Sequence, residues 1–333
     1  MNNQYIRNAQ SCAAEARRAV QEFHAGVDQP DMELVLFFCS SEYNLDELAD
    51  EMQRLFAGIQ VVGCTTAGEI GTEGYRTHSL SGVSFATNDC VAVSDVLNDL
   101  CHFNMTKGYA FCQSLIQKLE NRVPQAGPGN TFALLLIDGL SVREEQVAHT
   151  FQDGLNNILL VGGSAGDDGK FSKTFIYSNG RFETDCAALI LINTTLPFRP
   201  VMTHHFIGTD ERLVVTEADT AKRIVSEING LPAAQEYARL LGVSVRDLSP
   251  EHFAASPVVI KIGGMDYVRS IQTANQDGSL TFYCAIEKGM VLRVAYGIDL
   301  VKNLELVFED IETDIGIPQL IASCVIRKSP RII

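Results

Sequence analysis

Two related stretches of small and polar residues could bind a ligand through their backbone. The first runs from Val61 to Glu69 (VVGCTTAGE) and the second from Leu160 to Asp168 (LVGGSAGDD), with Gly63 and Gly162 lying 99 residues apart. Small side chains leave backbone amides uncovered, so a ligand or another backbone segment can approach closely. We therefore expect ligand-pocket turns formed by Gly63, Thr65, Thr66, Gly68, Gly162, Gly163, Ser164 and Gly166.

The second stretch also contains a serine hydrolase motif, Gly162 to Gly166 (GGSAG). In the G-x-S-x-G nucleophile elbow, a helix directly after the serine orients the hydroxyl group and supplies the oxyanion amide. Here Asp167-Asp168-Gly169-Lys170 and then a predicted strand follow Ser164, so that context is missing. A nucleotide-binding P-loop would need Gly-Lys-Ser/Thr, which neither stretch contains. A hydrolase using Ser164 is therefore the least favoured interpretation, and we expect no catalytic residue.

Three acidic residues end predicted buried strands: Glu42, Glu69 and Asp138. Two carboxylates in one site can perform acid–base chemistry or bind a cationic group. Strand-end acids also commonly cap the helix that follows, and no nucleophile and base can be paired from the sequence. We therefore favour a binding or capping role for these acids over catalysis.

None of the seven histidines forms a pair at metal-ligand spacing on one helix. His204 and His205 are adjacent on a predicted strand, where successive side chains face opposite sides. At most one of the two can therefore enter a given cavity. The nine cysteines include no C-x-x-C pair, which favours buried thiols over a disulfide framework or a zinc cage.

Composition excludes several classes of partner. The formal net charge is −15 and no cluster of Lys and Arg occurs, so we expect no binding to nucleic acid or to anionic membrane. The N-terminus lacks the pattern of a signal peptide, and no apolar run approaches the ~20 residues of a membrane span. We expect a soluble, cytoplasmic protein.

Hydrophobic periodicity predicts the elements that carry the two turns. A buried strand at 32–39, a helix at 45–56 and a strand at 59–64 predict a right-handed crossover with parallel strands. The same order recurs as a strand at 132–137, a helix at 141–155 and a strand at 158–161. We expect an internal duplication, in which a hairpin follows each crossover.

The segments around these crossovers predict further details. A helix at 9–23 precedes the first repeat, and strands at 80–85 and 91–97 are expected to pair as an antiparallel hairpin. The segment 124–130 (PQAGPGN) is rich in Pro and Gly, and we expect it to separate the repeats. A two-proline segment at 194–200 is the expected domain boundary.

The fold class that follows is α/β with two domains. Residues 1–194 form a duplicated domain of β-α-β plus hairpin units with mixed sheets. Residues 195–333 form a smaller α+β domain with short strands and helices. Near the C-terminus, the apolar run 319–326 is similar to the opening strand of another repeat.

Five motifs occur in order along nearly the whole chain: VLFFCSS, VVGCTTAGEI, GYRTHSLSGVSF, VGGSAGDD and VVTEADTAKRIVSEINGLPAAQEYARLLG. Together they resemble the FIST family of bacterial sensory proteins. Within that family, stretches such as 202–206 (MTHHF) show a general resemblance to the NosP-type nitric-oxide-sensing haem proteins. The resemblance implies a FIST N-type domain followed by a FIST C-type domain. FIST proteins usually continue after the strand at 321–326, whereas this chain ends at Ile333, so we expect a truncated C-type domain.

The resemblance implies signal transduction without catalysis. A NosP-type protein would hold haem through an axial ligand, for which His204 or His205 is the candidate and Tyr43 the alternative, with Arg199 at a propionate. Its partner would be a sensor histidine kinase of a two-component system, or a diguanylate cyclase or phosphodiesterase, and a homo-oligomer is compatible with it. The alternative is a FIST sensor for a small metabolite such as an amino acid, held by strand-end acids and turn amides.

Overall fold

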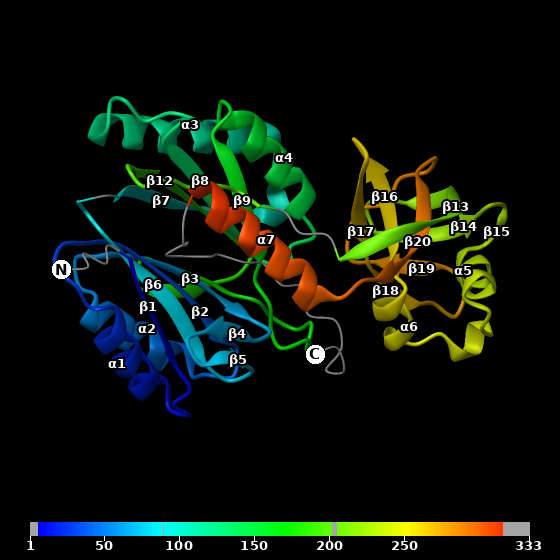
Figure 1. The fold of residues 1–333 in the computed structure, drawn as a ribbon, viewed down its shortest axis with the longest axis horizontal. Coiled ribbons are helices and arrows are strands. Elements are labelled where there is room, and N and C mark those ends of the chain that lie inside the picture. The colour runs from blue at the N-terminus through cyan, green and yellow to red at the C-terminus, as the bar shows by residue number, and fades with distance from the viewer. Residues whose placement is uncertain (1–5, 89, 202–204, 316–333) are drawn as a thin grey trace. The chain divides into compact units, whose positions relative to one another are not determined.

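The computed structural model describes residues 6–88, 90–201 and 205–315 (Figure 1). The chain divides into two compact units, of which the first ends at Phe198 and the second begins at Arg199. Within the described ranges, no helix combines the length and the apolar character needed to cross a bilayer. Each unit has its own apolar core.

The first unit is an internal duplication. Its first copy contains β1 (Ile6–Ser11), α1 (Ala16–Val27), β2 (Met32–Ser40), α2 (Leu45–Leu55), β3 (Gln60–Thr66), β4 (Glu69–Gly71), β5 (Gly74–Arg76) and β6 (Leu80–Ala86). The second copy repeats this order as β7 (Cys90–Asn98), α3 (Met105–Arg122), β8 (Thr131–Ile137), α4 (Glu144–Gly154), β9 (Leu159–Ser164), β10 (Ile176–Ser178), β11 (Arg181–Glu183) and β12 (Cys186–Thr194). The predicted duplication with mixed sheets is confirmed.

The two copies build sheets with the same strand order. The first sheet contains β1-β6-β2-β3 and the second contains β7-β12-β8-β9. In each sheet the two crossover strands, β2 with β3 and β8 with β9, are parallel and the other pairs are antiparallel. The parallel pairs follow from the helical crossover, which returns the chain to the same end of the sheet.

Buried side chains define four layers in this unit, helices outside and sheets inside (Figure 1). The sheets share one apolar core that includes Leu34, Leu36, Leu134 and Leu136. Alternate residues of the same strands point outward, so that β2 packs on α1 and α2, and β8 packs on α3 and α4. Strands buried on both faces read as continuous apolar runs, which is why β2 and β8 were recognisable from sequence.

Three sequence-based predictions about this unit were wrong. β6 and β7 do not pair with each other, because β6 lies between β1 and β2 while β7 pairs with β12. Along the chain, the boundary between the two copies therefore falls between β6 and β7. The segment 124–130 instead links α3 to β8 inside the second copy. The predicted helix at 9–23 begins only at Ala16, because residues 6–11 form β1 along the edge of β6.

The copies differ at the outer edges of β3 and β9. The hairpin of β10 and β11 adds antiparallel to β3, pairing Tyr177 with Gly63. The corresponding hairpin of the first copy, β4 with β5, forms a separate two-stranded sheet. Consequently β9 ends its sheet, and no strand of the described ranges borders its outer edge.

The second unit is smaller and antiparallel, as predicted for the α+β domain. Its sheet order is β17-β16-β20-β13-β14-β19-β18, with β15 paired to β14. The elements are β13 (Phe206–Asp219), β14 (Ile224–Ile228), β15 (Leu231–Pro232), α5 (Ala233–Leu241), α6 (Pro250–Ala255), β16 (Val258–Ile262), β17 (Met265–Arg269), β18 (Ile271–Ala274), β19 (Leu280–Phe282), β20 (Val291–Gly297) and α7 (Leu300–Ile315). The apolar run 319–326 lies outside the described residues.

Gly63 tests how tightly the first sheet packs. A Cβ atom at Gly63 would lie 2.6 Å from both the carbonyl oxygen and the ring of Phe37, so Gly63→Ala must displace a central strand. We expect a loss of about 2 kcal/mol in the free energy of unfolding, measured by urea denaturation. Gly129→Ala is the control, because nothing lies within 4 Å of its added methyl group. Equal stability of the two variants would contradict this packing.

Candidate functional site

The two small-residue turns meet each other inside the first unit. The backbone N–H of Gly166 donates to the carbonyl oxygen of Thr65 at 2.8 Å. A Cβ atom at Gly166 would lie 3.1 Å from the backbone nitrogen of Ala67, so only glycine fits this approach without a shift. Thr65 also exchanges hydrogen bonds with Phe175, through its N–H to the Phe175 oxygen at 2.9 Å and its Oγ1 from the Phe175 N–H at 3.0 Å. These small residues therefore join the two copies.

A buried carboxyl group lies directly after the first turn. Glu69 opens β4 and is 2% exposed. The hydroxyl groups of Thr66 and Ser79 donate to its two oxygens at 2.5 and 2.6 Å, respectively. Each oxygen thus has one donor already, and the carboxylate is fixed in orientation.

Asp168 brings a second carboxylate to the same corner from the other copy. Its backbone is in the left-handed region, with φ of 59°, and its side chain is only partly buried. The Oδ2 atom accepts hydrogen bonds from the hydroxyl groups of Ser40 and Ser41 at 3.2 and 3.1 Å. The second turn therefore reaches across to the end of β2.

The two carboxylates interact electrostatically. Burial raises the pKa of Glu69 from 4.5 to about 7, and the negative charge of Asp168 adds to this rise, although the hydrogen bonds from Ser79 and Thr66 oppose it. Removing a carboxylate from water disfavours its charged form, and a like charge nearby does the same. A bound cation would relieve both effects.

The place of these groups in the fold favours ligand binding. Ser40 and Thr66 end the parallel strands β2 and β3, whose register aligns them with each other. In α/β sheets, ligands bind in the crevice outside the carboxyl ends of parallel strands. We define the Glu69–Asp168 corner as Ser40, Ser41, Thr66, Glu69, Ser79 and Asp168. Hydroxyl and carboxylate oxygens dominate it, so it is suited to a group that donates several hydrogen bonds and carries positive charge.

The other strand-end acids lie in different surroundings. Glu42 is exposed and forms ion pairs with Lys170 at 3.3 Å and with His78 at 3.5 Å. Asp138 is buried and accepts hydrogen bonds from the Thr174 hydroxyl group and from the backbone N–H groups of Leu140 and Asp185. Asp138 therefore fixes local loops, whereas Glu69 lies within electrostatic reach of a second carboxylate, that of Asp168.

The remaining residues of the predicted turns have other surroundings. Gly63 lies inside the sheet over Phe37, and Gly68 lies against the ring of Tyr75. Gly162, Gly163 and Ser164 line a separate cavity of about 240 Å³ between β9 and α4, together with Leu135, Ile137, Glu144, Ala148, Leu160 and Val161. Ser164 ends β9, and a loop leads from it to β10. The helix that a hydrolase elbow requires is therefore missing after Ser164.

The described residues among the haem-ligand candidates contact other parts of the protein. His204 lies outside the described residues, and the ring of His205 packs against Phe206 with centroids 4.3 Å apart. The hydroxyl group of Tyr43 donates to the carbonyl oxygen of Ala13 at 2.8 Å, and Arg199 forms an ion pair with Asp310 at 2.8 Å. An axial ligand needs an imidazole, thiolate or phenolate facing an apolar cavity. Tyr43 and Arg199 thus each have a partner within their own unit, and haem binding by these residues stays a prediction.

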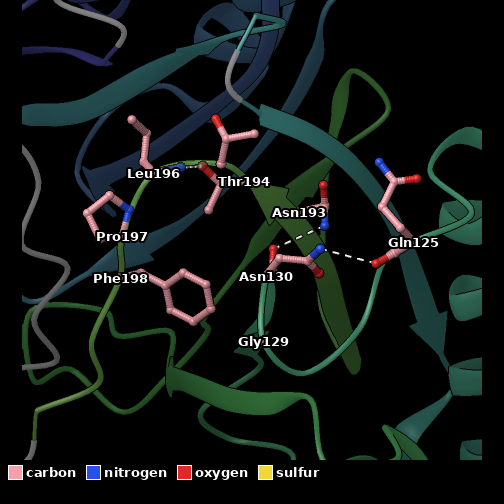
Figure 2. A pocket seen from close by; sticks show the side chains of 9 residues that line it. Gln125, Gly129, Asn130, Asn193, Thr194, Leu196, Pro197 and Phe198 are labelled. Carbon is pink, nitrogen blue, oxygen red and sulfur yellow. Dashed lines mark hydrogen bonds between the residues drawn. The ribbon is translucent and has the colours of Figure 1, made fainter.

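The larger of the two described cavities was not anticipated from the sequence. It has a volume of about 420 Å³ and is lined by Gln125, Gly129, Asn130, Asn193, Thr194, Thr195, Leu196, Pro197 and Phe198 (Figure 2). The amides of Asn130 and Asn193 donate to the carbonyl oxygens of Gln125 and Asn130, each at 3.1 Å. No titratable side chain lines this cavity, which favours a structural role for its polar groups.

Sequence reasoning also missed most partners of Glu69. Asp168 was visible as part of the second turn, and Ser40 and Ser41 as residues directly after the predicted strand at 32–39, but the sequence does not show that they meet. Ser79 lies just before β6, inside the motif GYRTHSLSGVSF, but nothing in that motif indicates a contact with Glu69. The sequence signal that could have identified the corner is that both turns end in an acidic residue, Glu69 in the first and Asp168 in the second.

Comparison with known proteins agrees with this organisation. The family model described as the FIST N domain matches residues 33–231, and the model described as the FIST C domain matches residues 233–331. The uncharacterised protein MJ1623 of Methanocaldococcus jannaschii is 26% identical over an alignment of 168 residues that covers 46% of this chain. The match spans 32% of that relative, about a third of its length. The FIST N match extends beyond Phe198, where the first compact unit ends.

The raised pKa of Glu69 predicts a pH-dependent stability. Between pH 4.5 and about 7 the folded protein retains a proton that the unfolded chain releases, so this contribution to stability is lost as the pH rises. From pH 5 to pH 8 we expect wild type to lose about 2 kcal/mol relative to Glu69→Gln, measured by urea unfolding at both pH values. The exposed Glu73→Gln variant serves as the control. A difference between wild type and Glu69→Gln that does not change with pH would contradict the prediction.

Proposed function

Because this chain belongs to the FIST family, whose domains are sensory, we propose that it senses a small metabolite through the Glu69–Asp168 corner. The ligand carries an ammonium group, and an amino acid is the simplest compound of this kind. The chain acts as a binding protein without catalysis.

The observation that carries this proposal is that the charge of Asp168, from the second copy, acts on the buried carboxyl group of Glu69, from the first copy. Glu69 is buried and held by two hydroxyl groups, while Asp168 is partly exposed and accepts from two more. An ammonium group is a three-donor cation, which matches acceptor-only carboxylates. Its charge stabilises the ionised form of Glu69, which burial and Asp168 otherwise disfavour.

The rim of the corner supplies groups for the rest of the ligand. Lys170 follows Asp168 by two residues and is paired with Glu42 at 3.3 Å on the surface. A ligand carboxylate can compete with Glu42 for Lys170 and accept from nearby backbone N–H groups. An amino acid would thus bridge the buried carboxyl group and the exposed cation.

Binding at this position offers a way to transmit a signal. Asp168 belongs to the second copy but bonds to Ser40 and Ser41 of the first. A ligand that binds Asp168 in place of Ser40 and Ser41 changes the contacts between the copies. It therefore shifts the equilibrium between conformations that differ in these contacts. The receiving partner in this proposal is a sensor histidine kinase or a cyclic-di-GMP enzyme.

Binding of amino acids tests the proposal directly. We expect calorimetry to detect binding of at least one member of a panel of amino acids, and no binding of the matching acids that lack the amine. Asp168→Asn and Glu69→Gln should each weaken binding about 10- to 100-fold, because each removes a charge-assisted hydrogen bond. Glu73→Gln, an exposed acid outside the corner, should bind as wild type does. Unchanged affinity in Asp168→Asn would refute the corner as the site.

A haem-based nitric oxide sensor is the alternative proposal, and it rests on the resemblance to NosP-type proteins. An absorption spectrum of the purified chain, with and without added haemin, separates the two proposals. Under the alternative, haemin gives a protein-bound Soret band that is lost in His204→Ala or His205→Ala. A Soret band that is the same in both single variants and in wild type would exclude these histidines as axial ligands.

A further inference from the structure

Three side chains with metal-binding atoms converge at a point that the ligand corner does not use. Asp99, Cys101 and His102 lie between β7 and α3, and all three are exposed. The Asp99 Oδ1 atom lies 2.7 Å from His102 Nδ1 and 3.1 Å from Cys101 Sγ. The distance from Cys101 Sγ to His102 Nδ1 is 3.2 Å. One carboxylate, one thiol and one imidazole therefore face a common centre.

The backbone around these residues is fixed by several contacts. Asp99 has a left-handed φ of 64° and starts a short 3-10 turn over Leu100–His102. Leu100 is fully buried and anchors the turn in the core beneath α3 and α4. Its N–H donates to the carbonyl oxygen of Asp185 at 3.0 Å, and the N–H of Cys101 donates to Asp185 Oδ1 at 2.9 Å. The three side chains thus project from a backbone that is fixed by the buried Leu100 and by the hydrogen bonds to Asp185.

The separations between the three atoms are close to those of a tetrahedral metal site. With metal–ligand lengths of about 2.0–2.3 Å, tetrahedral geometry places ligand atoms roughly 3.3–3.5 Å apart. The observed separations of 2.7–3.2 Å need only a small outward movement. Side chains of Asp99 and His102 are 52% and 76% exposed, so this movement meets little resistance and an ion can enter from solvent.

The donor set indicates the class of metal. Mg²⁺ and Ca²⁺ prefer sites made of oxygen ligands, whereas a thiolate and an imidazole suit borderline-soft ions. Zn²⁺ accepts sulfur, nitrogen and carboxylate oxygen in tetrahedral sites. Three protein ligands would leave a fourth position for water or for another donor.

We propose that Asp99, Cys101 and His102 form a binding site for one divalent transition-metal ion, with Zn²⁺ as the best match. On binding, the Cys101 thiol releases its proton to solvent and the thiolate sulfur bonds to the metal. Asp185 acts as a positioning residue, because it holds the backbone of Leu100 and Cys101. This site is independent of the proposed ligand corner.

This cluster contains neither a histidine pair on one helix nor a C-x-x-C pair, so the usual metal-ligand spacings do not mark it in the sequence. The signal that was present is D-x-C-H, in which the 3-10 turn brings the first residue back onto the fourth.

Cobalt binding tests the site in the full-length, metal-free protein. We expect Co²⁺ to give a sulfur-to-cobalt charge-transfer band at one equivalent, and Zn²⁺ to abolish that band by competition. Cys101→Ala should remove the band, and His102→Ala should weaken Co²⁺ binding at least tenfold. Cys12→Ala, which removes another exposed cysteine, should leave the band unchanged. A band that persists in Cys101→Ala, or that never forms in wild type, would overturn the proposal.

A second measurement keeps the test independent of folding defects in the variants. Equimolar Zn²⁺ should slow alkylation of Cys101 in wild type at least tenfold, as followed by mass spectrometry of its peptide. Alkylation of Cys12 in the same sample should proceed at its metal-free rate. Equal rates at Cys101 with and without Zn²⁺ would show that the three side chains form only a hydrogen-bonded cluster.

Discussion

The hydrogen bond from the Gly166 N–H to the Thr65 carbonyl oxygen is the contact on which the first unit depends. It joins the ends of two crossovers that the chain builds nearly 100 residues apart. Backbone atoms can meet here because Gly166 has no side chain and the facing residue is Ala67. Once this contact forms, Asp168 is placed beside Ser40 and Ser41 and its charge acts on Glu69. The ligand corner is thus a product of how the copies join.

The duplication also explains why the two turns differ in role. Each copy ends its parallel strands in small residues, yet β3 is covered by the hairpin of β10 and β11 while β9 ends its sheet. The first turn therefore lies deep and contributes buried hydroxyl and carboxyl groups. The second supplies the partly exposed acid Asp168 and the wall of the smaller cavity. Neither half contains the complete corner.

Much of the fold was predictable from local pattern, and the site was not. Continuous apolar runs such as β2 and β8 identify strands buried on both faces, and Asn44 caps α2 by accepting from the Glu47 N–H, as its residue type suggests. β1 escaped recognition because it is an edge strand in which the successive residues Arg7 and Asn8 are both exposed, so it lacks an apolar run. Which strands pair, and which side chains meet across copies, depends on long-range register. The encounter of Ser79 with Glu69 is of this kind, and no spacing rule contains it.

Among the described residues no strand borders the outer edge of β9, and this has a consequence beyond ligand binding. A strand whose outer side has no neighbouring strand is a template on which a foreign chain can add, and proteins commonly limit such additions with short edge strands and charge. β9 has only six residues, and the adjacent helix α4 begins with Glu144 and Glu145. These features allow only short strand pairing at this edge and disfavour acidic partners. Another copy of this chain is such a partner, because its formal net charge is −15. The short length of β9 and the acidic residues beside it are thus features that limit fibre-like self-association through this edge.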